Sequence, residues 1–161
     1  MEIRKTTPAD LEQVMAIYDR ARDFMRATGN PTQWAGGYPA RELICRDIEE
    51  GVSYVAFENG EPETVFLFRI GDDPTYHVIE DGAWIQDGPY GVIHRIASMG
   101  RVPGCGSKCI QWCFSQCGNL RCDTHDDNKV MQHVLEKNGF VRCGRIYIED
   151  GSPRIAYQKV Q

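Results

Sequence analysis

The 161-residue sequence has no excess of positive charge and no long hydrophobic run. It carries 18 Lys and Arg against 23 Asp and Glu, a formal net charge of −5. Nucleic acid and anionic membranes are therefore not expected as main partners, because both normally require a basic surface. No apolar stretch approaches the length of a transmembrane helix, and residues 1–5 do not begin a signal peptide. We expect a cytoplasmic protein that does not bind membranes.

The seven cysteines lack a Cys-x-x-Cys pair. An odd number of cysteines without a signal peptide indicates reduced thiols. Four of them recur at every fourth position, namely Cys105, Cys109, Cys113 and Cys117. Side chains four apart lie along one face of a helix and cannot easily surround one tetrahedral ion. We therefore expect no metal site, and interpret these cysteines as small apolar residues that let a helix lie close to a sheet.

The composition, 42% hydrophobic and 25% charged, is typical of a soluble globular protein. There is no internal repeat, low-complexity segment or linker, so residues 1–161 are expected to form a single domain. Apolar periodicity and turn residues predict an α/β (α+β) order of elements. The expected elements are a strand over 2–5, helices from Thr7 to Met25 and over 39–50, strands over 52–58 and 64–70, a loop over 71–91, a strand over 92–99, a helix up to Gly118, a strand over 120–125, a helix over 126–138 and a hairpin of 141–149 and 154–160.

The segment Val92–Gly118 combines a strand, a glycine-rich turn and a helix. This arrangement can hold an anion, because glycines let the backbone approach closely and the helix N-terminus favours negative charge. A diphosphate would fit, with Lys108 as a countercharge and Arg101 bracing the loop. An ordinary strand-to-helix turn that needs glycine for its backbone angles explains the same pattern equally well.

Residues 101–106, RVPGCG, fit the pattern Arg/Gln-x-x-Gly-x-Gly/Ala. This motif resembles the acetyl-CoA pyrophosphate loop of the GNAT superfamily of N-acetyltransferases, and it is neither a Walker loop nor a dinucleotide fingerprint. The segment from Asn128 to Phe140 looks like the Asn…Gly-Phe segment of the same family, at the right distance after the loop. The order of elements also resembles that family, so the likeness covers nearly the full chain.

The resemblance implies a mixed, mostly antiparallel central sheet with splayed parallel middle strands and about four flanking helices. It also implies acetyl-CoA as cosubstrate, with its pantetheine arm between the segments 93–99 and 120–125. The residues that this likeness assigns to cofactor binding are Ile96, Ala97, Ser98, Arg101, Val102, Pro103, Gly104, Cys105, Gly106, Ser107, Lys108 and Asn128.

The implied activity is transfer of an acetyl group to a primary amine of a small molecule or peptide, by direct attack in a ternary complex. Such a reaction needs a neutral amine and a stabilised carbonyl oxygen. Asp123 is the first candidate for the general base, followed by His94 and His125. Pairing of Asp123 with Arg121 or His125 would instead favour a structural role, and the alternative for His94 is a hydrogen bond that holds the two strands.

Four aromatic residues on two loops are candidate walls of a substrate pocket: Trp34, Tyr38, Trp84 and Tyr90. Trp34 and Tyr38 can equally seal the core. One position departs from the family pattern. Leu135 stands where many members have a tyrosine that protonates the leaving thiolate, so the general acid is not assigned. Besides the acetyltransferase, this departure leaves a second hypothesis, a non-catalytic acetyl-CoA-binding module of the same fold. The third hypothesis is an unrelated phosphate-binding α/β domain. The resemblance also implies that a homodimer can form.

Overall fold

The computed structural model describes all residues 1–161 and divides into two compact units. The first contains Met1–Phe68 and His94–Cys109, and the second contains Arg69–Ile93 and Ile110–Gln161. Seven strands form a mostly antiparallel sheet in the order β1-β2-β3-β4-β5-β7-β6, with β4 and β5 as a parallel pair. This sheet with its four α-helices confirms the predicted fold class. The single domain over 1–161 stays a prediction.

The bounds of the elements agree with the sequence analysis to within four residues, and the predicted loop over 71–91 contains one short 3₁₀ turn. The strands are β1 (Glu2–Lys5), β2 (Ser53–Glu58), β3 (Glu61–Ile70), β4 (Gly91–Ser98), β5 (Asn119–Thr124), β6 (Val141–Tyr147) and β7 (Pro153–Val160). The α-helices are α1 (Leu11–Ala27), α2 (Arg41–Glu49), α3 (Cys105–Cys117) and α4 (Lys129–Lys137), and the 3₁₀ turns are Pro8–Asp10 and Pro74–Tyr76.

Strand β3 begins three residues before its predicted start because the preceding turn is as short as a hairpin allows. Asn59 and Gly60 have φ angles of +53° and +78°. Two consecutive positive φ values are typical of a type I′ turn, whose twist matches that of the flanking strands. Pairing therefore resumes at once, with Glu58 opposite Glu61.

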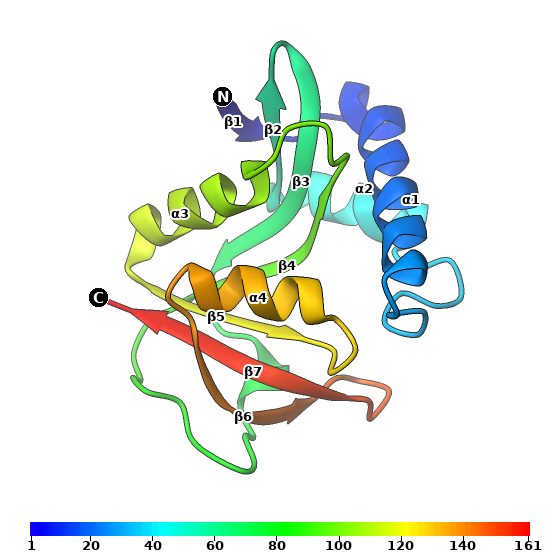
Figure 1. The fold of residues 1–161 in the computed structure, drawn as a ribbon. Helices are drawn as coiled ribbons and strands as arrows, with labels where there is room; N and C mark the ends of the chain where they lie inside the picture. Colours follow the sequence, from blue (N-terminus) through cyan, green and yellow to red (C-terminus); the bar gives the residue numbers. More distant parts are fainter. The chain divides into compact units, whose positions relative to one another are not determined.

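In the first unit, α1 and α2 lie beside β2 and β3 (Figure 1). The helices contribute apolar residues at helical spacing to a shared core, as expected for amphipathic helices on a sheet. That core contains Val14, Ile17, Tyr18, Trp34, Ile44, Val55, Val65 and Ala97. It places the loop between α1 and α2 against the sheet.

In the second unit, β5, β7 and β6 form an antiparallel group, and α4 is tied to β7 by the Tyr157 hydroxyl, which donates to Glu136 at 2.8 Å. The loop between β3 and β4 is anchored to β6, where Glu80 and Arg145 exchange backbone hydrogen bonds of 2.8 and 2.7 Å. A second core contains Tyr76, Tyr90, Val92, Ile146 and Ala156, with Trp84 packed against it.

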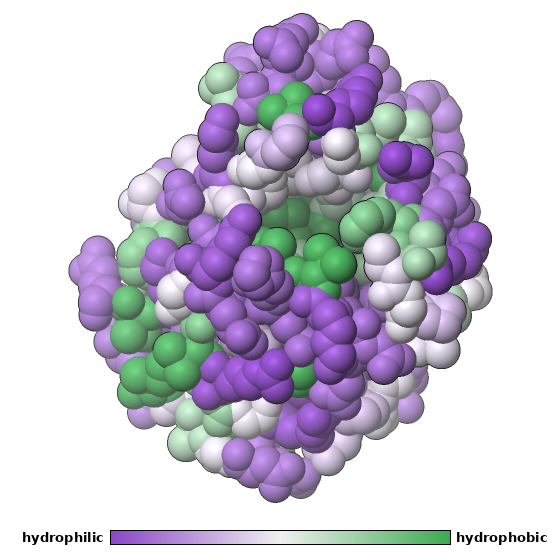
Figure 2. All heavy atoms as spheres, viewed as in Figure 1, coloured by the Kyte–Doolittle hydropathy of each residue, from purple (hydrophilic) through white to green (hydrophobic).

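All seven cysteines are free thiols, and Cys105, Cys109 and Cys113 are buried along one face of α3. Hydrophilic side chains predominate on the face drawn in Figure 2, with hydrophobic ones in smaller groups. None of the helices combines the length and the hydropathy needed to span a membrane.

Candidate active site

The glycine loop, residues 99–104, connects β4 to α3 in the first unit. At Gly104 the backbone φ is +82°, a left-handed conformation that favours glycine. The hydrogen-bond ladder of α3 begins with the N–H of Lys108, which donates to the carbonyl of Gly104 at 3.1 Å. The N–H groups before it belong to the positive end of the helix, where negative charge is stabilised. The loop therefore has a backbone geometry that suits a diphosphate.

A buried carboxylate holds the start of the glycine loop. Glu63 of β3 is 1% exposed and accepts hydrogen bonds from the N–H groups of Gly100 and Arg101 at 2.9 and 3.1 Å. The negative charge strengthens both hydrogen bonds. Sequence reasoning does not identify Glu63, because a single acidic residue near the start of a strand has the pattern of an exposed residue.

Two cations, one in the glycine loop and one in the first turn of α3, each have an acidic neighbour. Arg101 donates to Glu61 at 2.7 Å and to the carbonyl of Pro62 at 2.8 Å, so it braces the loop against β3 as predicted. Lys108 has a side chain that is 55% exposed, with its Nζ 3.7 Å from the Oε1 of Glu58. The contact of either cation with a cofactor stays a prediction.

The remaining predicted cofactor residues of the first unit differ in exposure. Ala97 and Cys105 are 5% and 1% exposed, so both are buried, and their contact with a cofactor stays a prediction. Hydrogen bonding with Cys109 lowers the pKa of the Cys105 thiol to about 7. The Oγ of Ser98 lies 2.7 Å from the Oγ1 of Thr64. Half-buried residues are Ile96, Ser98, Val102, Gly106 and Ser107, and exposed ones are Arg101, Pro103, Gly104 and Lys108.

Arg95 of β4 is a residue that the sequence analysis does not single out. Its φ is +52°, a strained conformation for a non-glycine residue that is frequent at functional sites. Its guanidinium donates to both carboxylate oxygens of Asp47 on α2, at 2.8 to 3.1 Å, and to the hydroxyl of Tyr38 at 3.1 Å. Burial alone would lower the pKa of Arg95, but Tyr38 and Asp47 raise it above its ordinary value.

One signal for this ion pair exists in the sequence. Asp47 falls within the apolar stripe that Ile44 and Ile48 form on α2, and a carboxylate on a buried helix face needs a cationic partner. The neighbour of Arg95 in β4, His94, is half-buried. The role of His94 as a base stays a prediction.

The two aromatic residues of the loop between α1 and α2 lie in different environments. Trp34 is 7% exposed and belongs to the core, with its ring 5.9 Å from that of Tyr18 in an edge-on arrangement. Tyr38 is 37% exposed, and its ring lies 6.0 Å from that of Trp34. Of the two predicted pocket walls, Tyr38 therefore presents more surface to a substrate.

In the second unit, the half-buried Asp123 of β5 accepts a hydrogen bond from the hydroxyl of Tyr76 at 2.6 Å. Arg121, one of the two partners considered for Asp123, lies elsewhere: its guanidinium stacks on the rings of Trp84 and Tyr90 at 4.3 and 4.2 Å. Burial lowers the pKa of Arg121. The carboxylate of Asp123 is therefore held by a tyrosine rather than by this arginine.

His125 lies just outside β5, which ends at Thr124, so the alternation of faces expected for a strand does not extend to it. Its Nδ1 accepts a hydrogen bond from the N–H of Asp127 at 2.9 Å, and the same nitrogen is 3.7 Å from that residue's carboxylate. These contacts give His125 a place in the turn that precedes α4. A catalytic role for it stays a prediction.

The loop aromatics of the second unit, Trp84 and Tyr90, pack around Tyr76 with ring centroids at 5.3 and 6.4 Å. Tyr90 is 7% exposed, and its hydroxyl donates to Asp72 at 2.9 Å and accepts from the N–H of Asp73 at 2.8 Å. Burial raises the pKa of Tyr90. Both predicted pocket walls thus take part in a packed aromatic cluster.

Helix α4 carries the second matching segment. The side chain of Asn128 caps the helix by accepting a hydrogen bond from the N–H of Met131 at 3.0 Å, which is a structural role beside the predicted cofactor contact. Leu135 is 1% exposed and fills an apolar position of the helix. The structure therefore places no hydroxyl on α4 at the position where many family members have their tyrosine.

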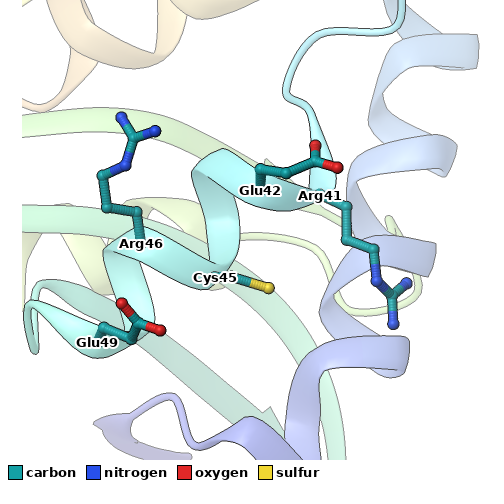
Figure 3. Close-up of a pocket in the computed structure, with 5 residues that line it drawn as sticks. All are labelled: Arg41, Glu42, Cys45, Arg46 and Glu49. Carbon is teal, nitrogen blue, oxygen red and sulfur yellow. The ribbon is translucent and has the colours of Figure 1, made fainter.

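A surface hollow lies along α2 and is lined by Arg41, Glu42, Cys45, Arg46 and Glu49 (Figure 3). All five residues come from one helix, and Arg41 forms an ion pair with Glu12 of α1. None of them is a predicted site residue. The structure contains no group of three His, Cys, Asp or Glu side chains arranged to hold a metal ion.

Comparison with known proteins finds matches among solved structures. No protein-family model and no curated protein sequence matches the chain. A GNAT-family acetyltransferase from Streptococcus agalactiae is 34% identical, with a TM-score of 0.90, over 99% of this chain and 95% of that one. A ribosomal-protein-alanine N-acetyltransferase from Brucella melitensis is 17% identical, with a TM-score of 0.67, over 100% of both chains. A NatC complex bound to Gag peptide and CoA is 16% identical, with a TM-score of 0.58, over 100% of this chain and 99% of that one. The last two share the fold alone, whereas the identity and coverage of the first show that this chain belongs to the GNAT family of acetyltransferases.

Proposed function

We propose that the protein transfers an acetyl group from acetyl-CoA to a primary amine. The observation that carries this proposal is the glycine loop, whose first two amides are fixed by the buried Glu63 and which leads into the N-terminus of α3. A preorganised row of amides at a helix N-terminus suits the diphosphate of CoA. The CoA-bound structural neighbour supports the same cofactor.

The acceptor is proposed to be an amine of a small molecule or a peptide. One neighbour of the same fold is named a ribosomal-protein-alanine N-acetyltransferase, and another was solved with a bound peptide. Both support a peptide amine as the first acceptor to test. The net charge of −5 slightly favours a cationic amine over an anionic one.

Asp123 is the proposed general base. Attack by the amine forms the new C–N bond and breaks the C–S bond, and the proton lost by the nitrogen passes to the Asp123 carboxylate, directly or through one water. The departing sulfur takes its proton from solvent, because the family's usual donor position is Leu135. The half-buried position of Asp123 on β5 gives its carboxylate both an anchor in the protein and access to solvent.

The test begins with calorimetric titration of acetyl-CoA, with ATP as the comparison ligand. Saturable binding of acetyl-CoA alone is expected, and equal binding of both would show a general phosphate site. Release of free CoA thiol is then measured with a panel of amines and peptides. Asp123→Asn should lower kcat about 10²- to 10⁴-fold, to a residual rate, while leaving acetyl-CoA affinity unchanged. Glu136→Gln, which neutralises another carboxylate that accepts from a tyrosine hydroxyl, should retain turnover.

A further inference from the structure

The hydrogen bond between Tyr76 and Asp123 joins segments 47 residues apart, and its length of 2.6 Å is typical of a strong bond to an ionised oxygen. The tyrosine is 1% exposed, whereas Asp123 is half-buried. Tyr76 is thus the buried partner of this pair. Asp123, whose carboxylate is the proposed base, is the partner with access to solvent.

Tyr76 is itself held from several directions. It ends the 3₁₀ turn Pro74–Tyr76, whose N-terminus is capped by the side chain of Asp73, and its own N–H donates to the carbonyl of Asp73 at 2.9 Å. Its carbonyl accepts a hydrogen bond from Trp84 Nε1 at 2.9 Å, and the rings of Trp84 and Tyr90 pack against it. The hydroxyl therefore has a fixed position from which to donate.

Burial and the nearby charge of Asp123 raise the pKa of Tyr76 well above its ordinary value. The hydroxyl consequently keeps its proton at neutral pH and acts as a donor to the carboxylate. A donor fixed by packing restricts the rotation of the carboxylate and leaves acceptor capacity on its second oxygen.

We propose that Tyr76 is a positioning residue that orients the carboxylate of Asp123 for proton transfer from the acceptor amine. This inference rests on the proposed role of Asp123 as general base. A buried tyrosine whose hydroxyl has only a structural role would form the same hydrogen bond. The test must therefore distinguish an effect on the orientation of the Asp123 carboxylate from an effect on the stability of the protein.

The experiment compares Tyr76→Phe with Tyr157→Phe in the full-length protein. Tyr157 is a matched control, because it is 0% exposed and also donates to a carboxylate, that of Glu136, at 2.8 Å. We expect Tyr76→Phe to lower kcat about 10- to 100-fold, since a misplaced catalytic group costs rate. The affinity for acetyl-CoA measured by calorimetry should not change, and Tyr157→Phe should keep its kcat.

The double variant Tyr76→Phe/Asp123→Asn decides whether the tyrosine acts through the carboxylate. If it does, the double variant is no slower than Asp123→Asn alone, because residues that act as one unit are not additive. Additive losses, or a Tyr76→Phe variant as active as Tyr157→Phe, would overturn the inference. If instead Asp123→Asn retains full activity, the proposed base itself is wrong, and this outcome is distinct from a failure of Tyr76 alone.

Discussion

The buried ion pair between Asp47 and Arg95 allows a quantitative test of how the first unit is held together. Asp47→Ala removes the carboxylate beside a guanidinium whose side chain is only 13% exposed. A buried charge that loses its partner costs about 3–5 kcal/mol. The hydroxyl of Tyr38 stays within 3.1 Å of the guanidinium. We therefore expect the free energy of unfolding to fall by about 3 kcal/mol, at the lower end of that range.

Urea unfolding followed by circular dichroism measures this change, with an unchanged m value as evidence that the transition stays the same. Asp19→Ala is the control, because its carboxylate is 64% exposed in its pair with Arg22, and its loss should cost less than about 0.5 kcal/mol. The double variant Asp47→Leu/Arg95→Met should recover most of the stability, since apolar side chains often replace a buried ion pair without loss. An Asp47→Ala variant no less stable than the control would refute the reasoning.

Three further predictions concern the loops and the first helix. Glu63→Gln should raise the Kd for acetyl-CoA about tenfold in calorimetry, because a neutral amide oxygen accepts the two loop N–H groups more weakly than the charged carboxylate does. In thermal unfolding, Gly82→Ala should destabilise by about 2 kcal/mol or more, since its Cβ would lie 1.9 Å from a backbone oxygen, whereas Gly88→Ala, with nothing within 4 Å, should cost about 1 kcal/mol. The hydrogen bond from Arg4 lowers the pKa of Asp10 from 3.8 to about 2. The ionised Asp10 therefore adds about 2 kcal/mol to the free energy of unfolding above the unfolded pKa, and this stabilisation is lost as pH falls toward 2. Asp10→Asn should abolish this pH dependence in acid unfolding curves.

Local features made the fold predictable. Asn59-Gly60 predicts a hairpin because few residues tolerate two positive φ angles, and the apolar spacing of α1 predicts its buried face. The glycine loop was located by a motif whose residues are consecutive. In each case the residues that determine the feature lie within about ten positions of one another, so the feature can be predicted from the amino-acid sequence alone.

The contacts that shape the candidate site are of another kind. Tyr76 meets Asp123 across 47 residues and Arg95 meets Asp47 across 48. Such pairs depend on how strands and helices pack, so periodicity can mark Asp47 as a buried carboxylate but cannot name its partner. The strained φ of Arg95 likewise has no sequence signal, because arginine does not favour a left-handed backbone.

The burial of most cysteines allows their labelling rates to report local opening of the structure. Cys45 and Cys117 are half-buried, whereas the other five cysteines are shielded from solvent. A thiol reagent should therefore label two positions quickly and the rest only when the surrounding structure opens, so that each slow labelling rate measures the free energy of a local fluctuation. Because Cys105 and Cys109 lie in one unit and Cys113, Cys122 and Cys143 in the other, mass spectrometry of labelled peptides can follow the two units separately without introducing a probe.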